Sequence, residues 1–178
     1  MAEKIKVATA WLDGCSGCHM SMLDMDERLI ALAPHIELVY GPLVDAKAPP
    51  GAVDLAIIEG AVSNEDDLAK ARKLRHCARF VIALGDCAVT GNVPSMRNPI
   101  GVERVFDRAY QKTVDLNPMR PTEGVPALLE RAMPVHEAID VDLFLPGCPP
   151  PADAIHFVLS ELIAGRKPDP TQLTRFGA

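Results

Sequence analysis

Leu-Ala-Ile-Ile at residues 55–58 and Phe-Val-Ile-Ala-Leu at residues 80–84 are apolar at every position. A strand with one face in water alternates apolar and polar residues. A strand buried on both faces is apolar throughout, as in a parallel sheet covered by helices. Three more apolar runs lie at residues 5–12, 36–40 and 141–145, with helical patterns between them. The sequence therefore predicts a doubly wound α/β architecture.

Three helices are predicted between and after these runs. Ser63 followed by Asp66 forms a candidate capping box for a helix that runs to about residue 75. Apolar residues recur at helical spacing in residues 18–33 and again in residues 155–163, which predicts two amphipathic helices packed on the sheet. The expected buried positions are Met22, Met25, Leu29 and Leu32 in the first and Ile155, Val158, Leu159, Leu162 and Ile163 in the second.

The stretch from residue 90 to residue 140 breaks this alternation of strands and helices. It contains several prolines and two weaker helical patterns, near residues 102–111 and 125–131. A connection of this length inside a compact domain is usually functional or part of an interface. We expect a long irregular excursion between the fourth and fifth strands that faces a partner.

The composition excludes several classes of protein. A chain of 178 residues fits one domain spanning residues 1–178. The net charge is −6 and no basic stripe is present, so nucleic-acid binding is not expected. No apolar stretch is long enough to span a bilayer, and the N-terminus carries neither an apolar signal core nor a twin-arginine sequence. We therefore expect a cytoplasmic protein without a membrane span, in which five cysteines indicate metal or redox ligands.

Four of the five cysteines follow predicted strands. Cys15 and Cys18 follow the first strand, Cys87 the fourth and Cys148 the fifth. Since the carboxyl ends of parallel strands share one edge of the sheet, we expect the four thiols at that edge, where ligands bind in open α/β folds. A glycine one or two residues before each cysteine lets the backbone approach a bulky ligand and donate N–H groups to its sulfurs. These glycines are Gly14, Gly17, Gly85 and Gly147.

Four converging thiols suit more than one chemistry. Two disulfides are disfavoured in a cytoplasmic setting. A structural zinc site usually uses two close pairs of ligands, and only Cys15 and Cys18 form a close pair here. A thiol oxidoreductase would use Cys15 and Cys18 alone and leaves Cys87 and Cys148 without a role. A cubane cluster takes four thiolates and tolerates ligands from separate loops. The pattern favours the cluster, with a zinc-stabilised interaction domain and a thiol oxidoreductase as alternatives.

The sequence around these cysteines resembles a known family. The motifs are Trp11-Leu12-Asp13-Gly14-Cys15-Ser16-Gly17-Cys18, Glu59-Gly60, Gly85-Asp86-Cys87 and Pro146-Gly147-Cys148-Pro149-Pro150. Together they are similar to the small subunit of NiFe hydrogenases and, more distantly, to the cluster-bearing subunit of respiratory NADH:quinone oxidoreductase. The resemblance implies a flavodoxin-like domain with strand order 2-1-3-4-5. It also implies one 4Fe–4S cluster, bound by Cys15, Cys18, Cys87 and Cys148, near a nickel–iron site.

Two differences from the wider family indicate which of its members the chain resembles most. Residues 149–178 contain no cysteine for further clusters, and the first motif has Cys-Ser-Gly-Cys where the respiratory relative has adjacent cysteines. The chain looks like the small subunit of the soluble, bidirectional, NAD-reducing hydrogenase. That family implies an oxidoreductase complex with a large subunit holding nickel and iron, and with diaphorase iron–sulfur and flavin subunits that reduce NAD⁺. No residue of this chain would perform the hydrogen chemistry itself.

Two residues beside the cysteines are candidates for tuning the cluster, together with Gly14, Gly17 and Gly147. Glu59 ends the third strand at the ligand edge, where a carboxylate can cap a helix, accept backbone N–H groups or relay protons. The structural roles are favoured, because loop N–H groups at such an edge need acceptors. His19 follows Cys18 and either donates a hydrogen bond to a cluster sulfur or faces solvent.

Other chemistry-bearing residues receive simpler interpretations. Trp11 is expected to be a core or interface anchor. Cys77 is predicted to end a helix at the opposite edge of the sheet as a buried free thiol. Ser16, Ser21 and Thr90 resemble remnants of a flavodoxin phosphate loop. Because Cys15 and Cys18 occupy that loop, FMN would need a different site, and we do not expect FMN in this chain.

Overall fold

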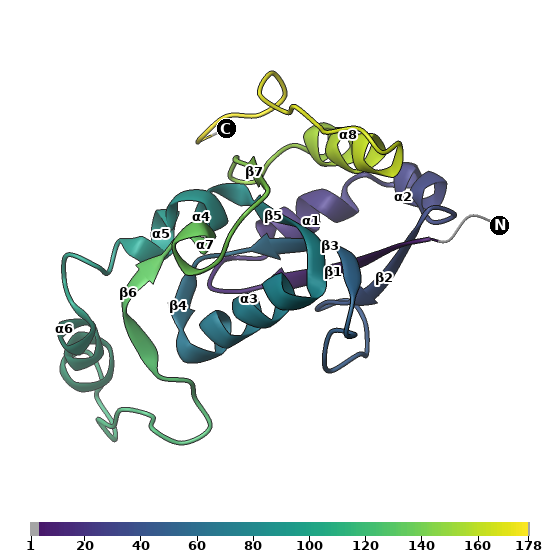
Figure 1. Ribbon diagram of the computed structural model, residues 1–178. Coiled ribbons are helices and arrows are strands. Elements are labelled where there is room, and N and C mark those ends of the chain that lie inside the picture. Colours follow the sequence, from purple (N-terminus) through teal and green to yellow (C-terminus); the bar gives the residue numbers. More distant parts are fainter. Residues whose placement is uncertain (1–3, 178) are drawn as a thin grey trace.

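The parallel sheet predicted from the apolar runs is present. The computed structural model describes residues 4–177; residues 1–3, which belong to the N-terminal stretch considered for a signal sequence, lie outside this range. Within it, five parallel strands form a sheet in the order β2-β1-β3-β5-β7 (Figure 1). Counted along this sheet, the order is the predicted 2-1-3-4-5, which confirms the flavodoxin-like fold. The strands are β1 Ile5–Trp11, β2 Ile36–Tyr40, β3 Val53–Glu59, β5 Ala78–Leu84 and β7 Leu143–Leu145.

The central strand β3 explains why its sequence is apolar at every position. Its side chains alternate between two buried clusters, with Ala56 and Ile58 in one and Leu55 and Ile57 in the other. All four are at most 4% exposed. Because both faces of β3 are covered, neither face accommodates a polar side chain without a buried hydrogen-bond partner.

Helices cover both faces of the sheet (Figure 1). One face carries α3 Glu65–Cys77, whose Ala71 and Leu74 are fully buried. The other carries α1 Gly17–Leu23, α2 Glu27–Leu32 and α8 Ala152–Ile163. The predicted apolar stripes face the sheet. Their buried members are Met22, Met25, Leu32, Ile155, Val158 and Leu159, and Leu29, Leu162 and Ile163 pack against them.

The helix expected over residues 18–33 is wrong in one respect, because the structure has two helices there. The helix is interrupted at residues 24–26, where Asp26 has a φ of 50° and a ψ of −123°, a backbone conformation outside the regions that non-glycine residues usually adopt. Met25, inside the break, is 1% exposed. Burial of this long apolar side chain offsets the helical hydrogen bonds lost at the break.

The N-terminal cap of α3 also differs from the expected Ser63 and Asp66. The cap is Asn64, whose Oδ1 accepts the Asp67 N–H at 2.9 Å, and the Asn64 amide donates to Asp67 Oδ2 at 2.8 Å. Ser63 donates to the same carboxylate through its N–H at 3.2 Å and its hydroxyl at 3.3 Å. The cap is therefore displaced by one residue, because α3 begins at Glu65, directly after the strand β4 Val62–Asn64.

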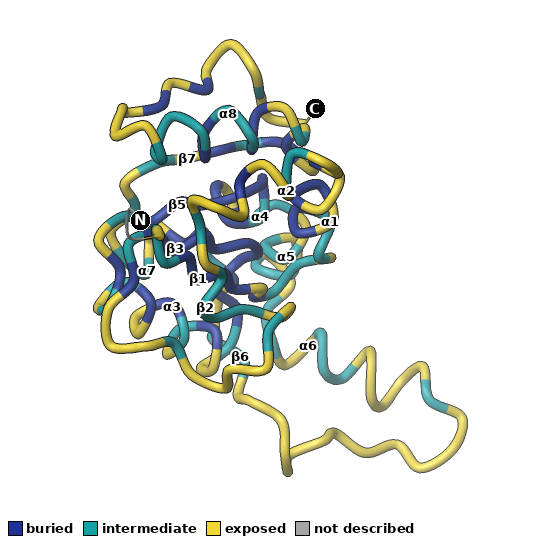
Figure 2. The backbone as a smooth tube through the Cα atoms, turned by 90° about the vertical axis from the view of Figure 1, so that its right-hand side faces the viewer, coloured by how far each residue is buried: buried dark blue, intermediate teal, exposed yellow. Residues whose placement is uncertain are grey.

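The excursion between β5 and β7 contains short helices and one additional strand. In chain order the elements are α4 Gly85–Thr90, α5 Asn92–Ser95, α6 Val102–Asp107, η1 Arg108–Lys112, β6 Leu128–Met133 and α7 Val135–Ala138. The helix expected near residues 102–111 is confirmed as α6 continued by η1. Figure 2 shows α6 and the segment after it projecting from the body of the domain, largely exposed.

The helix expected near residues 125–131 is wrong, because this segment forms the strand β6. β6 pairs antiparallel with β4, with Val62 opposite Met133 and Asn64 opposite Leu128. The local sequence contains good helix formers, but the backbone of β4 supplies hydrogen-bond partners that a helix could not use. Tertiary pairing thus overrides local propensity here. Among the described residues, no helix is both long enough and apolar enough to cross a membrane.

The displaced cap gives a first test. Asn64→Ala should lower the free energy of unfolding by about 1–2 kcal/mol, because it removes the acceptor for the Asp67 N–H. Ser63→Ala should cost less, since its hydroxyl makes only one 3.3 Å hydrogen bond to Asp67. Urea denaturation followed by circular dichroism measures both values. A larger loss in Ser63→Ala than in Asn64→Ala would contradict the assignment of the cap.

Candidate metal centre

Four cysteines lie at the carboxyl edge of the parallel sheet, each just after a strand. Cys15 and Cys18 lie on the connection from β1 into α1, Cys87 lies in α4 after β5, and Cys148 follows β7. Cys18 is buried, Cys87 is partly buried, and Cys15 and Cys148 are exposed. The edge position predicted for these residues follows from the strand order, because every strand of a parallel sheet ends on the same side.

The surroundings of Cys18 and Cys87 raise the pKa of both thiols. Burial raises the pKa of the Cys18 thiol, and the Glu59 carboxylate and then Cys87, Cys15 and Cys148 raise it further. The pKa of Cys87 is raised first by burial and then by Cys148 and Cys15. Thiolates that share this edge of the sheet repel one another, so the donor set suits a positively charged metal group, which deprotonates its coordinating thiols.

Glycines make the space beside these sulfurs. Gly85 has a φ of +83°, and a Cβ atom at this position would lie 2.2 Å from Cys18 Sγ. A Cβ on Gly17 would lie 3.2 Å from Cys15 Sγ, and a Cβ on Gly147 would lie 2.6 Å from the Pro150 Cα. Gly17 and Gly85 therefore leave room beside the sulfurs of Cys15 and Cys18, with the tighter contact at Gly85, whereas Gly147 leaves room for Pro150. The predicted approach of these loops to a bulky ligand stays a prediction.

Glu59 is buried beneath the first cysteine loop at 2% exposure. Its carboxylate accepts the backbone N–H of Cys18 at 3.3 Å and that of His19 at 2.9 Å, and it also contacts His19 Nδ1. It therefore satisfies N–H groups in the first turn of α1, where a helix leaves its donors unpaired. This is the structural role that the sequence favours for Glu59.

His19 is only 4% exposed, so the expectation that it could face solvent is wrong. Nδ1 is engaged by Glu59, and Nε2 is buried without a hydrogen-bond partner among the described residues. Buried polar atoms almost always have partners. The unpaired Nε2 beside the cysteine loop is therefore consistent with a bound group or a partner at this position.

The structure also places the remaining residues to which the sequence assigns a role. Trp11 is 45% exposed, so it is not a core residue, and its Nε1 donates to the Gly14 carbonyl at 3.0 Å. Cys77 ends α3 at the opposite edge from the other cysteines, as predicted, but its side chain is partly exposed and not buried. The hydroxyls of Ser21 and Thr90 donate to the carbonyls of Pro150 and Asp86, at 2.5 and 2.8 Å.

Sequence reasoning missed two polar residues beside the cysteines. Asp86 is buried and accepts the Gly147 N–H at 2.7 Å, and the Asn92 amide lies 3.8 Å from Cys148 Sγ. The only local signal was the Gly-Asp-Cys motif itself, in which Asp86 stands next to a cysteine. Its partners are distant in sequence, so no local pattern could have indicated them.

The geometry of the four cysteines can be compared with that of a structural zinc site. A closed tetrahedral zinc site holds its sulfurs about 2.3 Å from the metal, hence within about 4 Å of one another. Over residues 4–177, no group of three or more His, Cys, Asp or Glu side chains could hold a single metal ion. Among these residues, the side chains are therefore not preformed as a closed zinc site.

Comparison with known proteins agrees with the fold. A family model described as NADH ubiquinone oxidoreductase, 20 kDa subunit, matches residues 15–162, and the chain belongs to this family. A chain in the crystal structure of an NAD⁺-reducing NiFe hydrogenase in the H₂-reduced state superposes with a TM-score of 0.93 at 40% identity. That match covers 98% of this chain and 99% of the other.

Within the family, its relatives are hydrogenase subunits. The chain is 38% identical over 181 residues to the NAD-reducing hydrogenase HoxS subunit delta of Cupriavidus necator, covering 97% of this chain and 86% of that protein. It is 40% identical over 172 residues to a subunit of the F420-non-reducing hydrogenase of Methanothermobacter marburgensis, covering 94% of this chain. The chain spans only 56% of the length of that second relative. The resemblance to hydrogenase small subunits is confirmed.

The crowding at Gly85 gives a second test. Gly85→Ala should cost about 2–5 kcal/mol of unfolding free energy, because it adds both left-handed strain and a clash with Cys18 Sγ. Gly165→Ala is the matched control, since Gly165 has a φ of +71° and open space around it, and should cost only about 1–2 kcal/mol. Denaturation curves measure both losses. Equal losses in the two variants would show that Gly85 does not crowd the sulfur.

Proposed function

We propose that this chain is the electron-transfer small subunit of a NiFe hydrogenase and binds one 4Fe–4S cluster through Cys15, Cys18, Cys87 and Cys148. The observation that carries the proposal is that four cysteines from three loops follow strands at one edge of a fold shared with a hydrogenase chain. Such a cluster, when bound, carries one electron at a time. The reaction with hydrogen itself belongs to the large subunit, which would hold nickel and iron.

The residues around the thiols would hold and tune this group. Glu59 fixes the start of α1, so Cys18 and His19 keep a constant position relative to the end of β3. His19 Nε2 is then left to hydrogen-bond a cluster sulfur, and the backbone N–H groups that follow Gly14 and Gly147 would do the same. The N–H that follows Gly17 belongs to Cys18 and donates to Glu59 instead. Hydrogen bonds to sulfur and exclusion of water are the means by which a protein sets a cluster potential.

The excursion would form part of the surface that docks on the large subunit. It exposes apolar side chains that the domain itself does not cover: Met96, Ile100, Leu116, Met119 and Val125. Arg120 holds the excursion in shape, because its guanidinium donates to both Glu103 carboxylate oxygens at 3.1 Å and stacks 3.6 Å above the Phe106 ring. Exposed apolar residues gathered on an ordered arm are typical of protein–protein interfaces.

The names of the relatives support a proposal for the complex and the electron acceptor that this chain serves. The similarity to a subunit of an NAD-reducing hydrogenase supports a cytoplasmic complex in which electrons pass through this chain to diaphorase iron–sulfur and flavin subunits that reduce NAD⁺. The F420-non-reducing hydrogenase relatives support a NiFe hydrogenase of another electron-acceptor class. Both assignments share the same role for this chain, which is to connect the nickel–iron site with the next centre.

Metal analysis tests the cluster directly. The purified protein should contain about four iron atoms and an equal amount of acid-labile sulfide in this chain. Serine at Cys15, Cys18, Cys87 or Cys148 should reduce or abolish iron binding, because each change removes a thiolate ligand. Cys77→Ser is the matched control and should retain all the iron. Zinc in place of iron, or iron lost only in Cys77→Ser, would overturn the assignment.

The docking surface can be tested by shortening the excursion. Deleting residues 114–119, within the stretch 94–119, should prevent co-purification with the large subunit, because it removes the exposed Leu116 and Met119. The circular dichroism of the sheet should not change, since this loop contributes no strand. Ile30→Ser is the control, because Ile30 is an equally exposed apolar residue on α2, across the domain from α6 (Figure 1). Normal assembly and activity of the shortened chain would show that this loop is not the interface.

A further inference from the structure

Asp86 joins two of the cysteine loops through paired hydrogen bonds. Its backbone N–H donates to the Gly147 carbonyl at 2.9 Å, and its Oδ1 accepts the Gly147 N–H at 2.7 Å. Asp86 immediately precedes Cys87, and Gly147 immediately precedes Cys148. The two bonds therefore fix the separation of the backbones that carry these two thiols, although 61 residues separate them in sequence.

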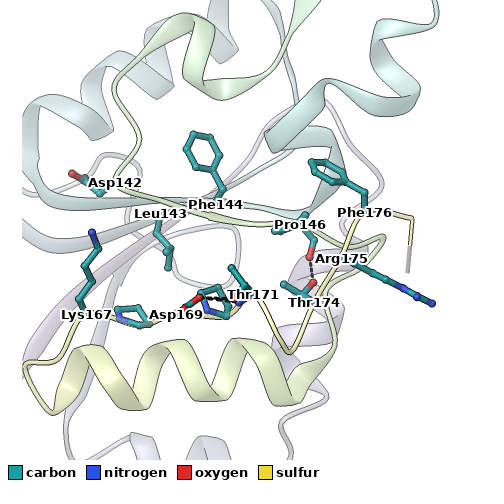
Figure 3. A pocket seen from close by; sticks show the side chains of 12 residues that line it. Asp142, Leu143, Phe144, Pro146, Lys167, Asp169, Thr171, Thr174, Arg175 and Phe176 are labelled. Atoms are coloured by element: carbon teal, nitrogen blue, oxygen red, sulfur yellow. Dashed lines mark hydrogen bonds between the residues drawn. The ribbon is translucent and has the colours of Figure 1, made fainter.

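The second oxygen of the same carboxylate binds the C-terminal segment. Asp86 Oδ2 accepts the Gly177 N–H at 2.9 Å, which brings a residue 91 positions away to the cysteine edge. The hydroxyl of Thr174 donates to the Pro146 carbonyl, in the same loop as Cys148 (Figure 3). Residues 174–177 thus contact Asp86 itself and Pro146, the residue that precedes Gly147, from outside the sheet.

The path of the C-terminal segment is set by packing. After α8 the chain turns back across the end of β7, with Pro168 and Pro170 buried (Figure 1). Figure 3 shows Arg175 and Phe176 where the segment passes Pro146. A cavity of about 680 Å³ remains between this segment and β7, lined by residues that include Leu143, Phe144 and Phe176. The segment is therefore held by its buried prolines at one end and by the hydrogen bonds of Thr174 and Gly177 at the other.

We propose that Asp86 is a positioning residue of the metal centre and that residues 174–177 form a clasp over it. The carboxylate holds the Cys148 loop beside Cys87, and the clasp keeps water from the Asp86–Gly147 pair. This inference rests on the proposed cluster function, because the role of Asp86 is to help Cys87 and Cys148 retain a metal group. The carboxylate is 6% exposed and accepts a backbone N–H on each of its oxygens, an arrangement that an amide in its place could not reproduce.

Asp86→Asn separates this role from simple packing. Asparagine has the same shape, but its one carbonyl oxygen can accept only one of the two N–H groups, and its own NH₂ faces the other. Amide hydrogen exchange in residues 145–148 or 174–177 should therefore become about tenfold faster. In the complex as purified, a ferrous chelator should remove iron about tenfold faster, and the electron paramagnetic resonance signal of the reduced cluster should change shape.

Asp67→Asn is the matched control. Asp67 is also 6% exposed and also accepts a backbone N–H, from Ser63, but it belongs to the start of α3. The Asp67→Asn variant should have a lower free energy of unfolding, with unchanged iron release and an unchanged resonance signal. A second variant, ending at residue 170, removes the clasp and leaves the Asp86–Gly147 pair. It should speed iron release while the resonance signal keeps its shape.

Two results would overturn the inference. One is wild-type exchange in both segments of Asp86→Asn, which would show that the carboxylate does not hold them. The other is wild-type iron release in Asp86→Asn despite faster exchange, which would show that the pair does not position the metal group. If the wild-type protein holds no iron, the proposed function fails, while the exchange measurement on the iron-free protein still decides whether Asp86 joins the two loops.

Discussion

The requirement that buried backbone N–H groups find acceptors shapes the cysteine edge of this protein. Every strand of the parallel sheet ends at this edge, and the loops and short helices that follow present donors with no partner in the sheet. Two buried carboxylates satisfy them. Glu59 accepts from the first turn of α1, and Asp86 accepts from Gly147 and Gly177. The thiols are held in place by the backbone segments that these carboxylates bind.

This solution places negative charge close to the thiols. Glu59 raises the pKa of Cys18, in addition to the effect of burial. In the absence of a metal group, four thiols and a carboxylate gathered here disfavour thiolate formation. A cationic metal core reverses that balance, because it stabilises the thiolates directly and reduces their mutual repulsion. The arrangement is therefore more easily explained as a site for a bound group than as a disulfide or dithiol site.

The excursion combines a rigid base with an exposed tip. Arg97 donates to the carbonyls of Ser63, Leu129 and Glu130, and Asn98 bonds both the N–H and the carbonyl of Ala132. These contacts secure the β4–β6 pair against α5 and the core. Beyond them the chain is mostly exposed, and its apolar side chains have no cover within the domain. A partner that covers the exposed end of the excursion would bind a segment whose attachment to the domain is already ordered. Less conformational entropy is then lost on association.

The sequence by itself determined the sheet and the position of the cysteines. Unbroken apolar runs such as residues 55–58 require burial on both faces, and residues that follow parallel strands must share an edge. Only the tertiary structure decided which side chains support that edge. Glu59 lies 40 residues from His19, and Asp86 lies 61 residues from Gly147. The pairing of β4 with β6, which replaced a predicted helix, has the same origin. Hydrogen bonds between distant segments depend on where the whole chain packs, and local periodicity carries no record of them.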